Sequence, residues 1–248
     1  MIGQPPQPPQ PPQPAQPVTG SEIAAGVNSA HARARVLMGV LLIGLLIRVG
    51  GIASSIAQHA LLSSIAAGIG LAPGQADAND ARERVIAVLK LLGLLATVVT
   101  WLVWQYRAYA NLRLVGTRET EYTPGWSVGY WFIPLLNLFR PYQITAELWS
   151  RSEIGNARDP IGGLSSPALV GVWWGSWLIT NFFARLYSTM SDSANTMQDF
   201  VSVTNYAILH DVLYIVATVI ALVVIRTIDS FQVAFTMTAQ TSAPPSPT

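Results

Sequence analysis

Four apolar stretches, each about as long as a membrane-spanning helix, constrain this chain more than any other feature. They cover residues 36–57, 85–105, 168–190 and 206–228. A helix needs about 20 consecutive apolar residues to cross the hydrocarbon core of a bilayer. Only 11% of the residues are charged, whereas soluble domains carry about 25%. The sequence therefore predicts an all-α bundle of four transmembrane helices, within a membrane domain at residues 31–230.

The net charge and the residue types exclude several other classes of protein. The formal net charge is +1, so no strong positive field favours nucleic acid as a partner. The chain has no cysteine, which excludes disulfides, iron–sulfur clusters and a cysteine nucleophile. The motifs of nucleotide-binding proteins, zinc proteases and serine hydrolases are also absent from the sequence. We therefore expect no cofactor, no metal site and no catalytic residue, and we predict that the protein is not an enzyme.

Polar tails flank the predicted membrane domain, and we expect both of them, residues 1–30 and 231–248, to be disordered. Residues 4–17 read QPPQPPQPPQPAQP, and this period of three matches the three residues per turn of polyproline II. A segment of this kind is either a semi-rigid tether or a ligand for an aromatic-lined groove of a partner protein.

The distribution of basic residues predicts how the helices are oriented in the membrane. Arginines cluster before the first span and between the second and third, at Arg33, Arg35, Arg107, Arg113, Arg118, Arg140, Arg151 and Arg158. The polar segments 72–84 and 191–205, which we predict to be loops, have balanced or acidic charge. Basic loops stay on the cytoplasmic side of a membrane. Both termini and residues 106–167 are therefore predicted to be cytoplasmic.

Residues 125–152 form the least regular part of the predicted membrane domain. The run GWSVGYWFIPLLNLF, at 125–139, is apolar but has only 15 residues, and Pro134 interrupts it. A fifth span here would place arginines on both sides of the membrane, against the usual charge distribution. We predict a cytoplasmic re-entrant or interfacial segment, followed by a helix from Pro141 to about residue 152.

The most distinctive pattern of the chain lies between residues 101 and 149. It reads WxxWxxRxxxNLR, followed by PGWxxGYWFIPxxNLxxPYQxxxE. This pattern resembles an uncharacterised bacterial family of multi-pass membrane proteins, catalogued as a domain of unknown function, whose members often have a Pro/Gln-rich N-terminal tail. The resemblance extends over about residues 35–230. It implies a multi-pass protein of the bacterial cytoplasmic (inner) membrane, and it brings no established activity or cofactor.

Polar and aromatic residues of this pattern are candidates for a site at the cytoplasmic edge of the membrane. The candidates are Trp104, Arg107, Asn111, Arg113, Trp126, Pro134, Asn137, Pro141 and Glu147. We predict that Glu147 pairs with Arg107 or Arg113. We also predict that Asn111 and Asn137 bond to backbone groups left free near the proline. This motif either binds a lipid headgroup or a small anion, or is an aromatic belt whose arginines anchor the helix ends.

Each predicted span also carries one charged residue in its outer half. These residues are Arg48, Lys90, Arg185 and Asp211. A charged side chain at the centre of a bilayer costs about 2.5–3.5 kcal/mol. Asp211 is therefore predicted to be ionised and paired with Arg48 or Arg185. The surplus positive charge either binds an anion or a lipid phosphate, or Lys90 and Arg185 extend outward to the headgroups.

Three functions are compatible with these features. The first is a non-enzymatic scaffold or signalling partner that recruits proteins through its tails and residues 106–167. The second is a small transporter or channel-like protein that binds an anion or a lipid headgroup. The third is a lipid-handling enzyme, which a single deep acid, Asp211, does not favour. The spacing of Gly171 and Gly175 permits close helix packing, either within the bundle or in a homo-oligomer.

Overall fold

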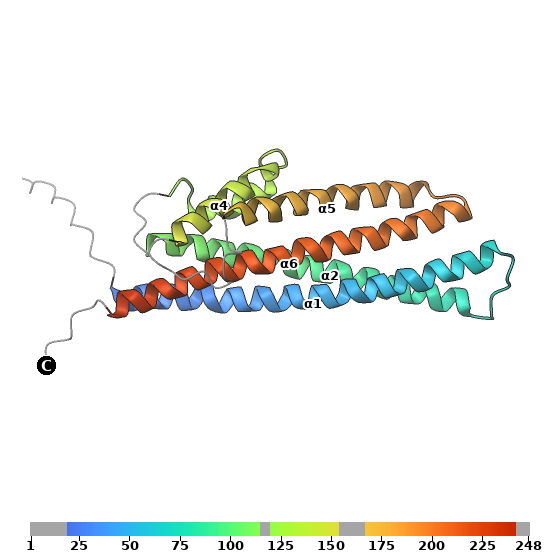
Figure 1. Cartoon of the computed structure of the whole chain (residues 1–248), viewed down its shortest axis with the longest axis horizontal. Helices are drawn as coiled ribbons and strands as arrows, with labels where there is room; N and C mark the ends of the chain where they lie inside the picture. Colours follow the sequence, from blue (N-terminus) through green and yellow to red (C-terminus); the bar gives the residue numbers. More distant parts are fainter. Residues whose placement is uncertain (1–18, 115–119, 154–166, 242–248) are drawn as a thin grey trace, which may run out of the picture.

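The computed structural model of this chain describes residues 19–114, 120–153 and 167–241. Within these ranges it has six α-helices, three short 3-10 helices and no strand, which confirms the predicted all-α class. The elements are α1 (Gly20–Ala66), α2 (Gln75–Ala110), η1 (Asn111–Arg113), α3 (Pro124–Gly129), η2 (Tyr130–Phe132), η3 (Leu136–Leu138), α4 (Arg140–Ser152), α5 (Ala168–Ser193) and α6 (Met197–Thr241). The four long helices α1, α2, α5 and α6 run up and down the length of the molecule (Figure 1).

Three of the described helices, α1, α2 and α6, are long and apolar enough to cross a membrane. The fourth predicted span, α5, is not among them, because polar residues such as Asn181 and Arg185 interrupt it. Many apolar side chains of α2 are exposed, including Val85, Leu92 and Val99. A long helix that exposes so much apolar surface is typical of a protein whose solvent is lipid. The structure thus indicates a membrane protein.

Both terminal helices are longer than the sequence predicted. Helix α1 begins at Gly20 and α6 extends to Thr241, so residues 20–30 and 231–241 are helical and do not belong to the predicted tails. Thr19 and Glu22 form a capping box that starts α1: each side chain accepts the backbone N–H of the other residue. The Pro/Gln repeat at 4–17, Arg118 and Arg158 lie outside the described residues.

The two predicted polar loops are mostly helical. Helix α2 starts at Gln75, directly after Pro73 and Gly74, and Gly74 has φ +78°, a conformation that favours glycine. Only residues 194–196 separate α5 from α6. The acidic residues that suggested loops, Asp77 and Asp199, lie in the first turns of helices, where a negative charge complements the helix dipole.

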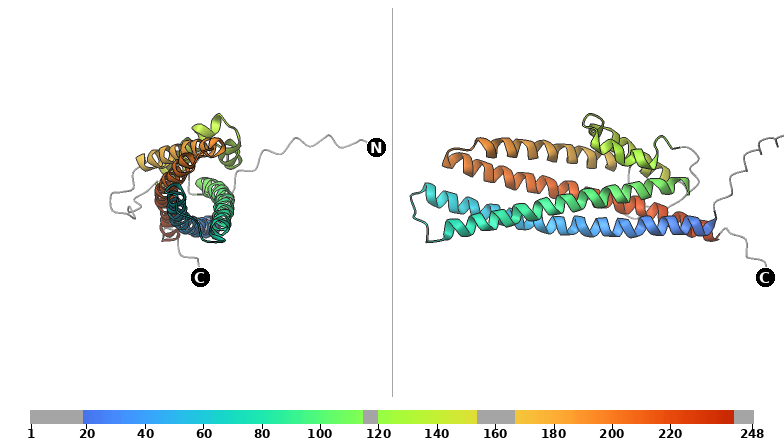
Figure 2. Two further views of the ribbon diagram at one scale, coloured as in Figure 1. Left: turned by 90° about the vertical axis from the view of Figure 1, so that its right-hand side faces the viewer. Right: turned by 180° about the vertical axis from the view of Figure 1, so that it is seen from behind.

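The long helices are arranged as an open arc when viewed along their axes (Figure 2). Helix α1 packs against α2 and α6, and α6 packs against α5, whereas α2 and α5 form the two edges of the arc and hardly touch. We call the end that holds the start of α1, the end of α6, and α3 and α4 the near end (Figure 1). The turns between α1 and α2 and between α5 and α6 form the far end.

The packed core lies mainly toward the near end, where α4 covers α5 and α6. Ile144, Leu148 and Trp149 of α4 are fully buried in this core, and Trp149 packs edge-on against Phe231 of α6. Pro141 lies in the first turn of α4, which confirms the helix predicted from Pro141 to residue 152.

Candidate functional site

Three of the four charged residues predicted in the outer halves of the spans, Arg48, Lys90 and Asp211, meet at the Asp211 carboxylate, which is fully buried. Arg48 Nη1 donates to Asp211 Oδ1 at 2.8 Å, and Lys90 Nζ donates to Oδ2 at 2.6 Å. His210 Nδ1 lies 3.8 Å from Oδ1. One carboxylate therefore ties α1 and α2 to α6. Two cations share one anion, so the cluster holds one surplus positive charge.

Arg185 does not join this cluster. Of the two predicted partners of Asp211, the structure brings Arg48 to it and leaves Arg185 exposed on α5, where it forms no ion pair with any described residue. Lys90 bonds to Asp211, so the alternative in which Lys90 extends outward to the headgroups is wrong. The position of a residue within a span predicts its depth, but the rotation of the helix about its own axis depends on packing.

Gly51 of α1 makes room for the Lys90–Asp211 pair. A Cβ atom at Gly51 would lie 2.6 Å from Lys90 Cε, 2.8 Å from Lys90 Nζ and 2.8 Å from Asp211 Oδ2. The preceding glycine, Gly50, faces open space, with no atom within 4 Å of the same position. Of these two adjacent glycines, Gly51 is therefore the one at which a side chain would displace Lys90 or Asp211.

A cavity of about 430 Å³ lies between α2 and α5, the two edges of the arc, and α1 and α6 also contribute to its wall. At its charged end it is lined by Arg48 and His210, and at its aromatic end by Trp101 and Trp131. The wall between them is mostly apolar, with polar contributions from Thr97, Asn137, Thr180, Asn181, Tyr214 and Thr218. Pockets for small ligands usually measure about 300–1,000 Å³ and combine apolar walls with a few polar groups. The size and the lining therefore suit a small amphipathic molecule.

Trp131 closes the aromatic end of the cavity. Its ring packs edge-on against Trp101 of α2 at 6.1 Å, and against Trp174 and Trp177 of α5 at 5.9 and 5.8 Å. Its Nε1 donates to Gln105 Oε1 at 2.9 Å, and the same oxygen accepts the Nε1–H of Trp101 at 2.8 Å. The segment between α3 and α4 thus bridges the gap between α2 and α5 at this level.

Pro134 lies in a break between two short 3-10 helices of this segment. No helix continues across it, as the sequence predicted, because Ile133 is extended and η3 starts only at Leu136. The side chains of Asn111 and Asn137 do not bond to the backbone near the proline, so that prediction is wrong. Asn137 Oδ1 is buried and has no hydrogen-bond partner among the described residues.

The predicted pairing of Glu147 with Arg107 or Arg113 is also wrong. The Glu147 carboxylate instead accepts the phenolic O–H of Tyr109, because α4 places it against this tyrosine. Arg107 donates to Ser29 Oγ of α1 at 3.0 Å, and Arg113 is exposed. These contacts hold α4 and α1 against the end of α2.

Asn111 belongs to a buried network that joins four near-end segments. Its Nδ2 donates to the carbonyl of Gly26 and to Gln232 Oε1, each at 3.2 Å. Gln232 Nε2 in turn donates to the carbonyl of Ala108 at 2.9 Å and to Ser152 Oγ at 3.2 Å. Since these polar groups satisfy one another in a buried place, the role of Asn111 is structural.

Three of the candidate residues from the pattern at 101–149 remain, namely Trp104, Trp126 and Pro141. Trp104 and Pro141 are buried, and Trp104 packs edge-on against Trp101 at 5.3 Å. Trp126 is 52% exposed and stacks on Tyr130 at 5.0 Å. None of the three lines the cavity described above.

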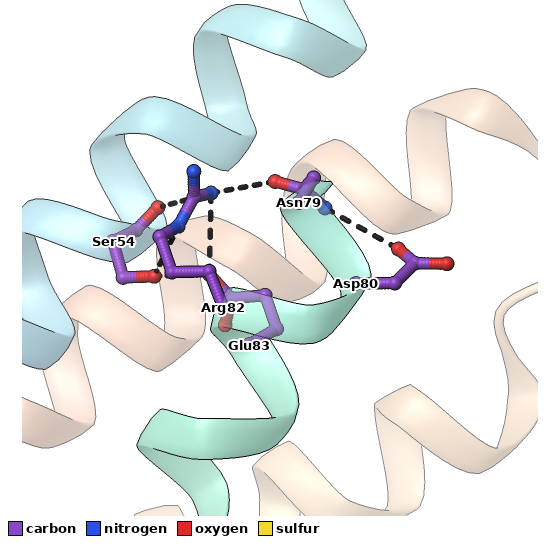
Figure 3. Close-up of polar contacts among 5 residues, drawn as sticks. All are labelled: Ser54, Asn79, Asp80, Arg82 and Glu83. Atoms are coloured by element: carbon purple, nitrogen blue, oxygen red, sulfur yellow. Dashed lines mark hydrogen bonds and ion pairs between the residues drawn. The ribbon is translucent and has the colours of Figure 1, made fainter. Parts of the chain in front are cut away.

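A separate polar cluster ties α1 to α2 at the far end (Figure 3). Arg82 Nε donates to Ser54 Oγ at 2.8 Å, and Arg82 Nη2 donates to Asn79 Oδ1 at 2.5 Å. Ser54 Oγ donates to Glu83 Oε1 at 2.6 Å, and Asn79 Nδ2 donates to Asp80 Oδ1 at 3.4 Å. Ion pairs between partly exposed side chains contribute about 0–1 kcal/mol, so this cluster is a modest structural tie.

The fold and the cavity define a class: a helical membrane protein with a cavity between two of its helices. The chain belongs to the family described as Domain of unknown function (DUF4328), whose model matches residues 67–230. This match confirms the resemblance seen in the tryptophan- and proline-rich pattern at 101–149. Comparison with curated proteins and with solved structures found no match.

Proposed function

We propose that this protein is a non-enzymatic, multi-pass protein of the bacterial inner membrane that takes up a small amphipathic molecule from the bilayer. The cavity between α2 and α5 is the observation that supports this function. It lies where the arc of helices is open, so a ligand dissolved in the hydrocarbon core of the bilayer would enter it laterally, between α2 and α5. Uptake of this kind suits a carrier or transporter, or a membrane scaffold that responds to its ligand.

Two unpartnered polar atoms in the cavity wall support the binding of a ligand. Thr97 Oγ1 and Asn137 Oδ1 are buried, and neither has a hydrogen-bond partner among the described residues. Buried polar side-chain atoms are nearly always hydrogen-bonded, so such exceptions need an explanation. Unsatisfied groups of this kind mark parts of the wall that a bound molecule or an ordered water would fill.

In the proposed arrangement α5 is the fourth span, and the segment between α3 and α4 is re-entrant. Helix α5 has 26 residues, so it is about 39 Å long, which exceeds the hydrocarbon core of about 30 Å. Trp131 contacts Trp177, which lies nine residues after the start of α5, about 14 Å along the helix. The segment would therefore enter the membrane beside α5 and return to the near end.

We propose that the near end faces the cytoplasm, with both chain ends on that side. The described basic residues on the elements of this end include Arg33, Arg35, Arg113, Arg140 and Arg151. At the far end, Arg82 and Arg84 are balanced by nearby acids of α2, and residues 191–205 have no basic residue. Arginine-rich segments remain on the cytoplasmic side of a bilayer.

Cysteine labelling should place Ser150 and Ser193 on opposite sides of the membrane. Both side chains are exposed, one on α4 and the other at the last residue of α5, and the natural chain has no cysteine to interfere. In intact cells, a membrane-impermeant maleimide should label Ser193→Cys from outside. It should label Ser150→Cys only after the inner membrane is permeabilised. Labelling of both positions from one side would refute this topology.

Filling the cavity should weaken ligand binding. Trp101, Trp131, Trp173 and Trp177 line the cavity, so a dibrominated fatty alcohol bound there should quench tryptophan fluorescence. Ala217 of α6 is buried and lines the cavity, and Ala217→Phe should raise the apparent Kd about tenfold by taking up space for the ligand. The measurement is a quenching titration of the full chain in detergent micelles.

The matched control for this titration is Ala96→Phe on the exposed face of α2, outside the cavity wall. It should bind the alcohol as the natural protein does. Equal affinities of the two phenylalanine variants would show that the alcohol binds elsewhere, and the cavity would then not be the site.

A scaffold role is the second candidate function, and one exposed apolar surface favours it. Trp126, Phe132 and Leu135 are 52%, 70% and 76% exposed in the segment between α2 and α4. Exposed apolar groups of this size mark surfaces that contact lipid or another protein. Together with the Pro/Gln repeat they would recruit a partner at the cytoplasmic edge. Gly175 also faces open space, so it leaves room for a second copy of the chain.

A further inference from the structure

We propose that the polar head of the ligand is a carboxylate that binds Arg48 at the charged end of the cavity, with a single acyl chain extending toward the tryptophans. The ligand class is therefore a long-chain fatty acid anion. This inference rests on the proposed function and names the ligand of that same cavity.

The guanidinium of Arg48 has N–H donors that are not used within the described part of the protein. Arg48 is 8% exposed as a residue and its side chain is 10% exposed, and the residue lines the cavity. Its Nη1 donates to Asp211, and its Cζ lies 3.9 Å from the centre of the Tyr214 ring. Arginine has five N–H donors, and among the described residues the only hydrogen bond of the Arg48 side chain is the one from Nη1 to Asp211. A carboxylate is the group whose geometry matches this fork of donors.

The charge of the cluster favours a ligand with one negative charge. Arg48 and Lys90 share the single carboxylate of Asp211, which leaves one positive charge without a counterion in the part of the chain that the structure describes. An uncompensated charge at membrane depth is costly. A carboxylate neutralises the cluster, a neutral alcohol leaves it positive, and a cationic head would add to the repulsion. A doubly ionised phosphate monoester would leave the cluster with a negative charge instead.

The shape of the cavity favours a single chain over a diacyl lipid. The charged end lies at the level of Lys90, and Trp101 follows eleven residues later on the same helix, about 16 Å along its axis. Between these levels the wall is largely apolar, with Leu94, Val98 and Ala217 among its members. A volume of about 430 Å³ over this length accommodates one narrow chain.

The test compares a dibrominated fatty acid with the dibrominated fatty alcohol of the same chain length, by tryptophan quenching at a pH where the acid is ionised. The natural protein should bind the acid at least about tenfold more tightly than the alcohol. Arg48→Gln should abolish this preference, whereas Arg48→Lys should keep much of it because the charge remains. Arg185→Gln is the matched control, since this arginine is exposed and does not line the cavity.

Each outcome of this comparison has a distinct meaning. Equal binding of acid and alcohol by the natural protein would overturn the assignment of the carboxylate and leave the proposed function in place. Quenching by neither compound would overturn the proposed function itself. A preference for the acid that survives in Arg48→Gln but is lost in Arg185→Gln would move the anion site to α5 and refute the role of Arg48. The comparison of acid and alcohol on the natural protein tests the carboxylate assignment even if Arg48→Gln does not fold. Arg48→Lys is the second variant, because a lysine keeps the positive charge that pairs with Asp211.

Discussion

Asp211→Ala should lower the free energy of unfolding by about 3–5 kcal/mol and sharply reduce the yield of folded protein. Among the described residues, Asp211 is the only carboxylate that bonds to Arg48 and Lys90, so its removal leaves two cations inside the bundle without their counterion. Removing one partner of a buried ion pair is far more damaging than removing both, because an unpaired buried charge remains. Thermal unfolding in detergent, together with the monodisperse fraction in size-exclusion chromatography, measures the effect.

Two double-mutant cycles show whether the pairing itself is responsible. Arg48→Ala with Asp211→Ala, and Lys90→Ala with Asp211→Ala, should each destabilise the protein less than the sum of the two single losses. Arg185→Ala, at an exposed position of the same predicted layer, should stay within about 0.5 kcal/mol of the natural protein. Strictly additive losses in both cycles would contradict the shared ion pair.

The contrast between Arg48 and Arg185 shows which properties of a membrane site the sequence predicts. It predicts the depth of a charged residue but not the direction in which its side chain points. Charged residues inside an apolar span are rare enough to identify all four candidates, and their positions in the spans predict similar depths. Whether a side chain points into the bundle depends on how its helix is rotated. Packing decides that rotation, and it turns Arg48 inward and leaves Arg185 exposed.

The tryptophan- and proline-rich pattern at 101–149 is distinctive in the sequence, but the sequence does not predict the contacts of its side chains. Proline chemistry correctly predicts the break at Pro134 and the helix that starts near Pro141. The partners of Glu147 and Asn111 depend on the docking of α4 and on Gln232, which the sequence placed in a disordered tail. Long-range hydrogen bonds of this kind have no local sequence signal.

The cavity has no sequence signature either. Its wall takes residues from α1, α2, α5, α6 and the segment around Trp131, and most of them are apolar residues with no distinguishing sequence pattern. Thr97 and Thr218 look like unremarkable threonines within spans, although both line the cavity. Only the open arc, in which α2 and α5 hardly touch, brings these residues around one space.

Gly51→Ala should lower the free energy of unfolding by about 1–3 kcal/mol, the usual effect of overpacking a tight contact. The new Cβ would lie 2.6 Å from Lys90 Cε and 2.8 Å from Asp211 Oδ2. The lysine chain is flexible and can retreat, but it then gives up its bond to a carboxylate held by Arg48 on the other side. Thermal unfolding of the purified protein in detergent measures the change.

Gly50→Ala provides a control of opposite sign one residue away. No atom lies within 4 Å of a Cβ at Gly50, so this substitution should stabilise α1 by up to about 1 kcal/mol through the higher helix propensity of alanine. If the contact with Lys90 causes the loss at Gly51, most of that loss should disappear when Gly51→Ala is made in a Lys90→Ala background. Equal stability of the two alanine variants would show that the Lys90 side chain does not lie against Gly51. The packing of α1, α2 and α6 around Asp211 would then differ from the one seen in this structure.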